Sequence, residues 1–148
     1  IRTSWLYSSF GSNFVKTIIR LSKEKGFVNV VYDQTGTPTY AADLAEAIIK
    51  IVSGVIRNQH AFIAGIYNYS NEGVCSWYDF AVEIVRESGL VCKVNPLLSS
   101  EYQATAQRPL YSVMDKKKIK ETYDLIIPHW RTSLKKCISI LEDQIMIT

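Results

Sequence analysis

Two side chains in predicted loops have the chemistry that a phosphorylated sugar requires. Trp5 lies at the end of an apolar, β-branched stretch, residues 1–7, that is predicted to be a strand. An indole beyond the carboxyl end of a strand can pack against a sugar ring while its N–H donates to a hydroxyl. Arg108 precedes Pro109 in a long irregular stretch, and a guanidinium binds phosphate oxygens through paired hydrogen bonds, which suits a diphosphate. The alternatives are a core tryptophan and a surface arginine.

Other polar side chains in loops are candidates of the same kind, with less support. Gln34 lies in the turn-rich segment DQTGTPT, residues 33–39, where its amide can either bind a ligand or brace the turn. Asn13, Tyr102 and Gln103 are weaker candidates. Together these residue types predict a ligand-binding surface built from loops.

The sequence contains no recognisable catalytic motif. None of its seven glycines forms G-x-G-x-x-G or a P-loop, so no phosphate-binding turn is encoded. None of its nine tyrosines has a lysine four residues later, which excludes the Tyr-x-x-x-Lys pair of short-chain reductases. No serine, cysteine or threonine lies in a nucleophile motif. From spacing alone, this chain has no catalytic centre.

Composition excludes several other classes of protein. A formal net charge of +3 over 148 residues is too small for a typical nucleic-acid binder, and the apolar runs are shorter than the roughly 20 residues of a membrane helix. With no targeting segment in the sequence, the cytoplasm is the expected compartment. Three widely spaced cysteines indicate buried free thiols rather than a disulfide framework, and with two histidines they show no zinc spacing.

A run of lysines at residues 116–120 is the only dense basic segment. We expect it to be the solvated face of a helix, with an anion-binding patch as the alternative.

Alternating strands and helices position the candidate residues. The predicted order is β–α–β–α–β–α–β–loop–α–α, which indicates an α/β layered fold with at least some parallel pairing. The predicted strands cover residues 1–7, 27–33, 65–70 and 90–96, the last stopped by Pro96. Helices are predicted within residues 11–26, after Thr39, within 75–89, at 116–123 and within 128–145.

Capping residues and apolar stripes mark the helices. Ser12, Thr39, Ser76 with Asp79, and Asp115 are the predicted N-terminal caps, and Gly26 and Gly89 the predicted ends. The second helix is predicted to bury Leu44, Ile48, Ile51 and Val55. The last helix is predicted to bury Trp130, Leu134, Cys137, Ile138, Leu141 and Ile145.

Four separated motifs resemble one family in the right order along nearly the whole chain. They are RTSWLYSSFGSNFVKTIIRLSKEK, VVYDQTGTPTYAADLA, GIYNYSNEGVCSWYDFAVEI and RPLYSVMDKKKIKETYDLIIPHW. Together they resemble the C-terminal half of dTDP-4-dehydrorhamnose reductases, which are extended short-chain dehydrogenases/reductases. One departure is YQATAQRP at residues 102–109, which lacks the earlier prolines of the family's loop and is less pre-organised.

The resemblance implies a fold and a reaction for the parent protein. Residues 1–148 would be late strands of a Rossmann sheet interleaved with the smaller substrate-binding domain. A preceding part, absent here, would carry the cofactor loop and the catalytic Tyr and Lys. The parent enzyme would transfer hydride from NADPH or NADH to dTDP-4-dehydro-L-rhamnose, whereas this chain alone would be inactive. The family also suggests a homodimer and, for some members, Mg²⁺, although no residue here indicates a metal site.

The resemblance also implies roles for the candidate residues. The family's tryptophan beside the sugar matches Trp5, and its R-P motif near the nucleotide matches Arg108; Gln34 and Asn13 match family motifs without an assigned contact. The alternatives are another nucleotide-sugar reductase or epimerase, or a non-catalytic relative such as the regulatory β-subunit of methionine adenosyltransferase.

An unpaired edge on the strand at residues 1–7 further predicts association with another chain.

Overall fold

Short paired strands connect the helices of this protein. The computed structural model describes residues 1–102 and 108–146, in which the strands form three two-stranded sheets. The pairs are β1 (Leu6–Tyr7) parallel to β4 (Thr39–Tyr40), β2 (Phe27–Val31) parallel to β6 (Lys93–Leu97), and β3 (Thr35–Gly36) antiparallel to β5 (Cys75–Ser76). The predicted α/β fold with parallel pairing is therefore confirmed.

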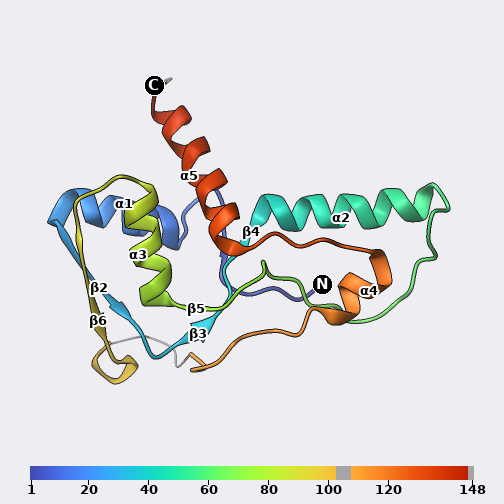
Figure 1. Ribbon diagram of the computed structural model, residues 1–148, viewed down its shortest axis with the longest axis horizontal. Coiled ribbons are helices and arrows are strands. Elements are labelled where there is room, and N and C mark those ends of the chain that lie inside the picture. The colour runs from blue at the N-terminus through green and yellow to red at the C-terminus, as the bar shows by residue number, and fades with distance from the viewer. Residues whose placement is uncertain (103–107, 147–148) are drawn as a thin grey trace.

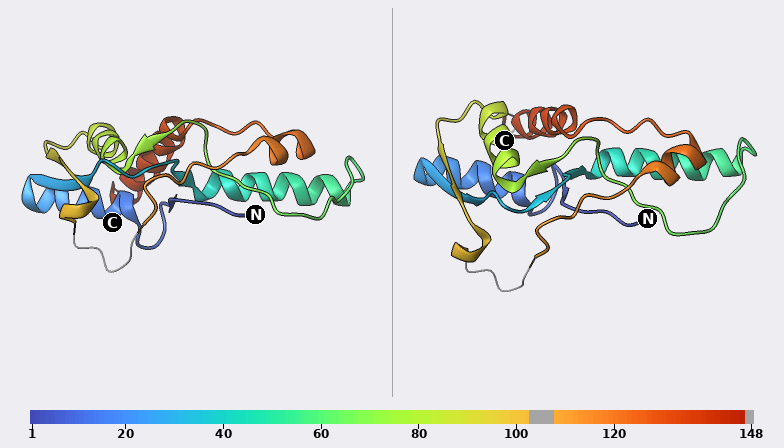
Figure 2. Two further views of the ribbon diagram at one scale, coloured as in Figure 1. Left: turned by 90° about the horizontal axis from the view of Figure 1, so that it is seen from below. Right: turned by 60° about the horizontal axis from the view of Figure 1, so that its bottom comes forward.

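Six helical segments accompany these strands. They are α1 (Phe14–Lys25), α2 (Ala41–Ile56), α3 (Trp77–Glu87), the 3₁₀ turn η1 (Ser99–Glu101), α4 (Lys117–Tyr123) and α5 (Trp130–Met146), counted within the described residues. Figure 1 shows an elongated molecule, with α1, α3, β2 and β6 at one end and α2 and α4 at the other. The two further views in Figure 2 show the same separation.

Each end of the molecule has its own apolar core. At the end with α1 and α3, the largest fully buried side chains include Trp130 and Phe80, whose rings meet edge to face at 5.7 Å. At the other end, α2 and α4 share a smaller core of Ala47, Ile51, Tyr67, Tyr69, Ile119, Tyr123, Leu125 and Ile127. The predicted apolar face of α5 is buried at Trp130, Leu134, Cys137, Ile138 and Leu141.

A buried polar network joins α2 to the start of α5. Asn71 is fully buried and accepts a hydrogen bond from the Tyr40 backbone N–H at 2.7 Å. Its amide nitrogen lies 2.6 Å from the Asp43 carboxylate and 2.9 Å from the Ser133 hydroxyl. The carboxylate also accepts from Ser133. These bonds satisfy polar groups that would be costly to bury alone.

Two of the predicted helix starts are wrong. Asn13, and not Ser12, caps α1, because its side-chain oxygen accepts from the Lys16 N–H at 3.2 Å. Thr39 lies in β4, and α2 follows Tyr40 without a side-chain cap. In the second case strand pairing continues up to the helix and leaves no separate capping residue.

The predicted cap at Ser76 and the predicted helix ends at Gly26 and Gly89 agree with the structure, whereas the N-cap of α4 is Lys116, one residue after the predicted Asp115. Ser76 and Asp79 form a reciprocal capping box at the start of α3. Gly26 and Gly89 adopt left-handed conformations, with φ of 68° and 61°, just after α1 and α3. Asp115 accepts a hydrogen bond at 2.8 Å from the N–H of Lys117, the first residue of α4.

The predicted stripe of α2 is partly wrong. Ile51 is buried, but Ile48 is 41% exposed. The exposed side of the helix carries Ile48, Ile49, Val52 and Ile56, whereas the buried side carries Asp43, Ala47, Ile51 and Gly54. Because α2 is apolar on two sides, periodicity alone cannot decide which side faces the core.

Two of the predicted strands are much shorter in the structure. Residues 1–7 form the two-residue β1 and a single bridge from Arg2 to Asn68, and residues 65–70 form no strand beyond that bridge. Pro96 lies inside β6, opposite Val30, and does not end the strand. A proline is tolerated there because β6 pairs on one side only within the described residues.

No helix of the described residues is long and apolar enough to cross a membrane.

Candidate functional site

The carboxyl ends of β2 and β6 meet and are closed by hydrogen bonds. Asp33 follows β2, and its carboxylate accepts from the Ser99 hydroxyl at 2.6 Å and from the Ser99 N–H at 3.0 Å. The side-chain hydrogen bond from Ser99 lowers the pKa of Asp33. Parallel strands bring their carboxyl ends to one edge, which is where α/β sheets bind ligands.

Gln34 lies at this edge and is buried. Its amide nitrogen donates to the Ser99 hydroxyl at 2.9 Å, and its backbone oxygen accepts from the Trp77 N–H at 3.3 Å. The structure therefore gives Gln34 a bracing role between η1 and α3. A ligand contact through its side-chain oxygen remains a prediction.

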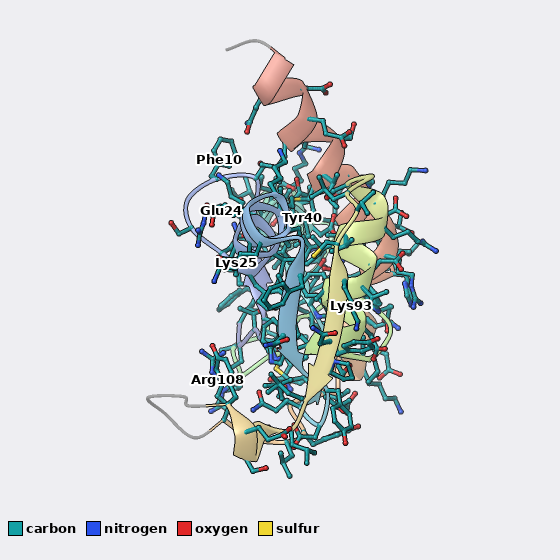
Figure 3. All side chains as sticks on the ribbon, turned by 90° about the vertical axis from the view of Figure 1, so that its left-hand side faces the viewer. Phe10, Glu24, Lys25, Tyr40, Lys93 and Arg108 are labelled. Atoms are coloured by element: carbon teal, nitrogen blue, oxygen red, sulfur yellow. The ribbon has the colours of Figure 1, made fainter. Side chains whose placement is uncertain are left out.

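The segment 108–112 runs beside β3. The Thr35 N–H donates to the Leu110 oxygen at 2.7 Å, and the Ser112 N–H donates to the Thr35 oxygen at 2.8 Å. Arg108 is exposed and forms no ion pair with any described residue. Figure 3 shows its side chain toward the carboxyl ends of β2 and β6, away from Lys25 and Lys93. Its guanidinium is thus available to an anion.

Trp5 lies against β3 in a strained backbone conformation. Its φ is 49°, in the left-handed region that bulky residues avoid. The indole is half-buried and stacks on Trp77, with ring centroids 3.7 Å apart and ring planes 12° apart. The sequence predicts that Trp5 ends a strand. In the structure Trp5 instead precedes β1. We call Trp5, Gln34, Gly36, Trp77 and residues 108–112 the β3 site.

Local structure explains how these residues come together. The pairing of β3 with β5 places Gly36 opposite Cys75. The capping box at Ser76 then fixes Trp77 as the first residue of α3. Trp77 therefore reaches Trp5 through pairing and capping between segments far apart in the sequence.

The predicted site residues are only partly gathered in the β3 site. Trp5, Gln34 and the exposed Arg108 belong to it. Asn13 caps α1 and donates to the Ser8 oxygen at 2.7 Å, so both ends of its amide are used in local structure. Tyr102 is exposed beyond η1, and Gln103 lies outside the described residues.

Sequence reasoning missed Trp77 and Gly36. Trp77 was assigned only to a helix, and Gly36 only to a turn. The SWYD motif carried the available signal, because a capping box at Ser76 fixes the position of the next side chain. The partner of that side chain, Trp5, could not be read from local sequence.

Four buried side chains, Tyr7, Tyr69, Cys75 and Cys137, are poorly suited to proton transfer or nucleophilic attack. Burial raises the pKa of Tyr7 and of Tyr69 well above the usual range, so neither readily gives up a proton. Burial also raises the pKa of Cys75 to about 12 and that of Cys137 to about 11. Among the described residues, no cluster of three or more His, Cys, Asp or Glu could hold a metal ion.

The lysine run is largely engaged by the protein itself. Lys116 and Lys120 both pair with Glu72, at 3.1 and 2.8 Å. Lys118 donates to the Ile66 oxygen at 3.2 Å. These contacts favour a structural role over a free anion-binding patch.

The described residues do not fit a dinucleotide cofactor. Such a group needs a glycine-rich turn between a parallel strand and a helix. The connection from β1 to α1 contains one glycine, Gly11, and β4 runs directly into α2 without a glycine. β2 and β6 continue into β3 and η1 instead of long helices.

Comparison with known proteins finds one family model and several relatives that match most of this chain. The model of the family described as RmlD substrate binding domain matches residues 1–142. The chain is 45% identical over 136 residues to the spore coat polysaccharide biosynthesis protein SpsK of Bacillus subtilis, covering 92% of this chain and 45% of that protein. It is 37% identical over 141 residues to dTDP-4-dehydrorhamnose reductase of Aggregatibacter actinomycetemcomitans, covering 91% and 48%.

A solved structure shows the same arrangement. The dTDP-4-dehydrorhamnose reductase of Bacillus anthracis, in complex with NADP, superposes with a TM-score of 0.85 at 39% identity. The match covers 94% of this chain and 47% of that one. The chain thus spans about half the length of the relatives it matches.

Proposed function

This chain belongs to the family of RmlD substrate-binding domains, and from that premise we propose that it is the sugar-nucleotide-binding part of an NADPH- or NADH-dependent dTDP-4-dehydro-L-rhamnose reductase. The β3 site holds the dTDP-sugar, with Trp5 against the sugar ring and Arg108 near the diphosphate. Gln34 and Asn13 shape the surrounding loops. The support that carries most weight is the family match over residues 1–142.

The chemistry of the β3 site agrees with a binding role. A half-buried indole offers an apolar face and an N–H donor to a sugar. An exposed guanidinium without an ion-pair partner among the described residues suits phosphate oxygens.

We assign cofactor binding and proton donation to parts of the parent fold that this chain does not span. Residues 1–148 form one unit in this proposal, with the late Rossmann strands and the substrate-binding region interleaved. The chain alone then has no reductase activity. The parent protein is a homodimer by analogy with its family.

A chimera tests the proposal directly. The chain replaces the matching segment of the Bacillus anthracis reductase, to which it is 39% identical, and NADPH oxidation is followed with dTDP-4-dehydro-L-rhamnose as substrate. We expect turnover by the chimera and none by the 148-residue chain alone. The variant Trp5→Ala in the chimera should raise KM for the sugar about tenfold, which corresponds to the loss of one strong aromatic contact.

The outcomes of this experiment distinguish the proposed reductase from the alternative functions. A folded chimera that binds NADPH but does not reduce the sugar would contradict the proposal and favour a non-catalytic relative. Preference for a different nucleotide sugar would favour another reductase or epimerase. Turnover by the isolated chain above the blank would refute the assignment of the catalytic groups elsewhere.

A further inference from the structure

The direction of the Trp5 side chain depends on its surroundings. A tryptophan at a φ of 49° is in a conformation that costs of order 1–3 kcal/mol and persists only where neighbouring groups hold it. The Thr39 N–H donates to the Trp5 backbone oxygen at 3.1 Å, which anchors the main chain but not the ring. Other contacts must therefore fix the indole.

Trp77 covers one face of this indole. The two rings are nearly parallel and in close contact, as the 3.7 Å separation shows. Trp77 is itself held by Phe14, with ring centroids 4.6 Å apart, and its backbone is held by Gln34. Because Trp77 is the first residue of α3, the stack fixes the Trp5 indole relative to α3.

Gly36 provides the space that the ring of Trp5 occupies. A Cβ atom at this position would lie 2.6 Å from Cε2 and 2.7 Å from Cζ2 of Trp5, closer than real Cβ contacts allow. It would also lie 2.6 Å from the Ser112 hydroxyl oxygen. Any larger residue at position 36 must displace the indole, the Ser112 side chain or β3 itself.

The neighbours of Trp5 do not enclose it completely. Trp5 is only half-buried, and its N–H has no hydrogen-bond partner among the described residues. An indole N–H normally finds a partner when it is enclosed. A ligand hydroxyl in the β3 site would supply one.

We propose that Trp77 and Gly36 are positioning residues that fix the Trp5 indole as a rigid platform for the sugar. This inference rests on the proposed function, because it assigns the sugar to Trp5. Rigid placement matters because a ligand held by a mobile ring loses the benefit of pre-organisation. Neither Trp77 nor Gly36 needs to touch the ligand.

Circular dichroism of the 148-residue chain tests the platform without any ligand. Two indoles stacked this closely should give an exciton couplet in the far-ultraviolet spectrum. We expect Trp77→Leu and Trp5→Leu to abolish the couplet, and Gly36→Ala to reduce it. Trp130→Phe is the matched control, since it removes a buried indole outside the stack. A couplet that survives in Trp77→Leu would overturn the inference.

Kinetics of the chimera test the effect on the sugar. Trp77→Leu and Gly36→Ala should raise KM for the dTDP-sugar about tenfold, the factor associated with one lost aromatic contact, and leave KM for NADPH unchanged. Trp77→Phe should raise KM for the dTDP-sugar much less than Trp77→Leu does, because phenylalanine keeps an aromatic face. Gly65→Ala is the control for glycine replacement, since the φ of Gly65 is not left-handed and the nearest atom to a Cβ there is the flexible end of the Lys118 side chain, at 2.9 Å.

The readouts distinguish the two proposals. An inactive parent chimera would contradict the proposed function, while the couplet would still decide whether Trp77 fixes the ring. An active chimera whose sugar KM is unchanged in both Trp77→Leu and Gly36→Ala would overturn this inference alone. Equal changes in the two KM values would indicate general damage to the fold and would also count against it.

Discussion

Burial controls the chemistry of the three thiols at the scale of single residues. Cys75 and Cys137 lie in the core, whereas Cys92 is half-buried after α3. Thiol reagents attack the thiolate, so a thiol that is both covered and reluctant to ionise reacts slowly. The raised pKa values of Cys75 and Cys137 act in the same direction as their lack of exposure.

We therefore predict that one thiol per chain reacts rapidly with a disulfide reagent at pH 8. Burial holds the pKa of Cys75 at about 12 and that of Cys137 at about 11, so both remain protonated at that pH. All three thiols should react after unfolding in denaturant, and Cys92→Ser should remove the fast phase. Two or more fast thiols in the folded chain would contradict the burial of Cys75 or Cys137.

Residue types in the β3 site could be predicted from sequence, but their contacts could not. The chemistry of Trp5 and Arg108 follows from the side chains themselves. The stack of Trp5 on Trp77 depends on β3–β5 pairing between segments about 40 residues apart, a tertiary contact that local patterns do not encode. Asn13 caps α1, a role that the sequence analysis assigned to Ser12, and its contact with the ligand stays a prediction.

At the scale of elements, the network around Asn71 holds α2 against the start of α5. Its side chain serves both as an acceptor, for the Tyr40 N–H, and as a donor, toward Asp43 and Ser133. It also donates at 3.1 Å to the oxygen of Pro128, two residues before α5 begins. One amide thus joins three segments.

Asn71→Ala should lower the free energy of unfolding by about 3 kcal/mol, because it leaves buried polar groups without partners. Urea denaturation at neutral pH measures this change. Asn29→Ala is the control, since Asn29 is exposed in β2 and its side chain accepts a hydrogen bond from Asn95, which is also on the surface; we expect about 0.5 kcal/mol or less there. Similar losses in the two variants would argue against a special role for the network.

Helices were predictable where capping and periodicity agree. α3 and α5 have clear apolar faces, and the capping box of α3 is local in sequence. The two-residue strands β3, β4 and β5 were not predictable, because so short a strand is defined by its partner and not by its own residues. The buried side of α2 was not predictable for another reason, because both sides of this helix are apolar.

At the scale of the whole molecule, Glu72 links α4 to the start of α5. Its carboxylate pairs with Lys116 and Lys120, and its backbone oxygen accepts from the Trp130 N–H at 3.0 Å. Burial alone would raise the pKa of Glu72, but the hydrogen bonds and charges of the two lysines outweigh it and the pKa is lowered.

Stability should therefore decline in acid partly through Glu72. A carboxylate whose pKa is lowered on folding stabilises the protein above its unfolded pKa, near 4.5, and this contribution is lost as the pH falls through the folded value. Glu72→Gln should reduce the difference in urea midpoint between pH 7 and pH 3. Glu121→Gln, in the exposed pair with Lys117, should retain the parental difference. An unchanged pH dependence in Glu72→Gln would exclude this linkage.

The exposed side of α2 predicts association of the isolated chain. Ile49 and Ile56 are 65% and 75% exposed, beside Ile48 and Val52 on the same side of the helix. The association expected from an unpaired edge at residues 1–7 thus has a better cause in this apolar surface, since β1 contains only two residues.

Light scattering should show a mean mass above that of the monomer, rising with concentration. Ile49→Lys should bring the mass back toward the monomer, because it places a charge in the apolar surface. Val91→Lys, at a position that is 97% exposed outside α2, should have no such effect. A monodisperse monomer at high concentration would show that the α2 surface does not drive association.

The parallel pairing of β2 with β6 has a consequence for synthesis of the chain. Asn29 and Asn95, which face each other across this pair, are 66 residues apart. At about 5–20 residues per second, a ribosome needs about 3–13 seconds to make the intervening segment. During that interval β2 has been made before its partner, so Val28, Val30 and Val31 have no strand to pair with.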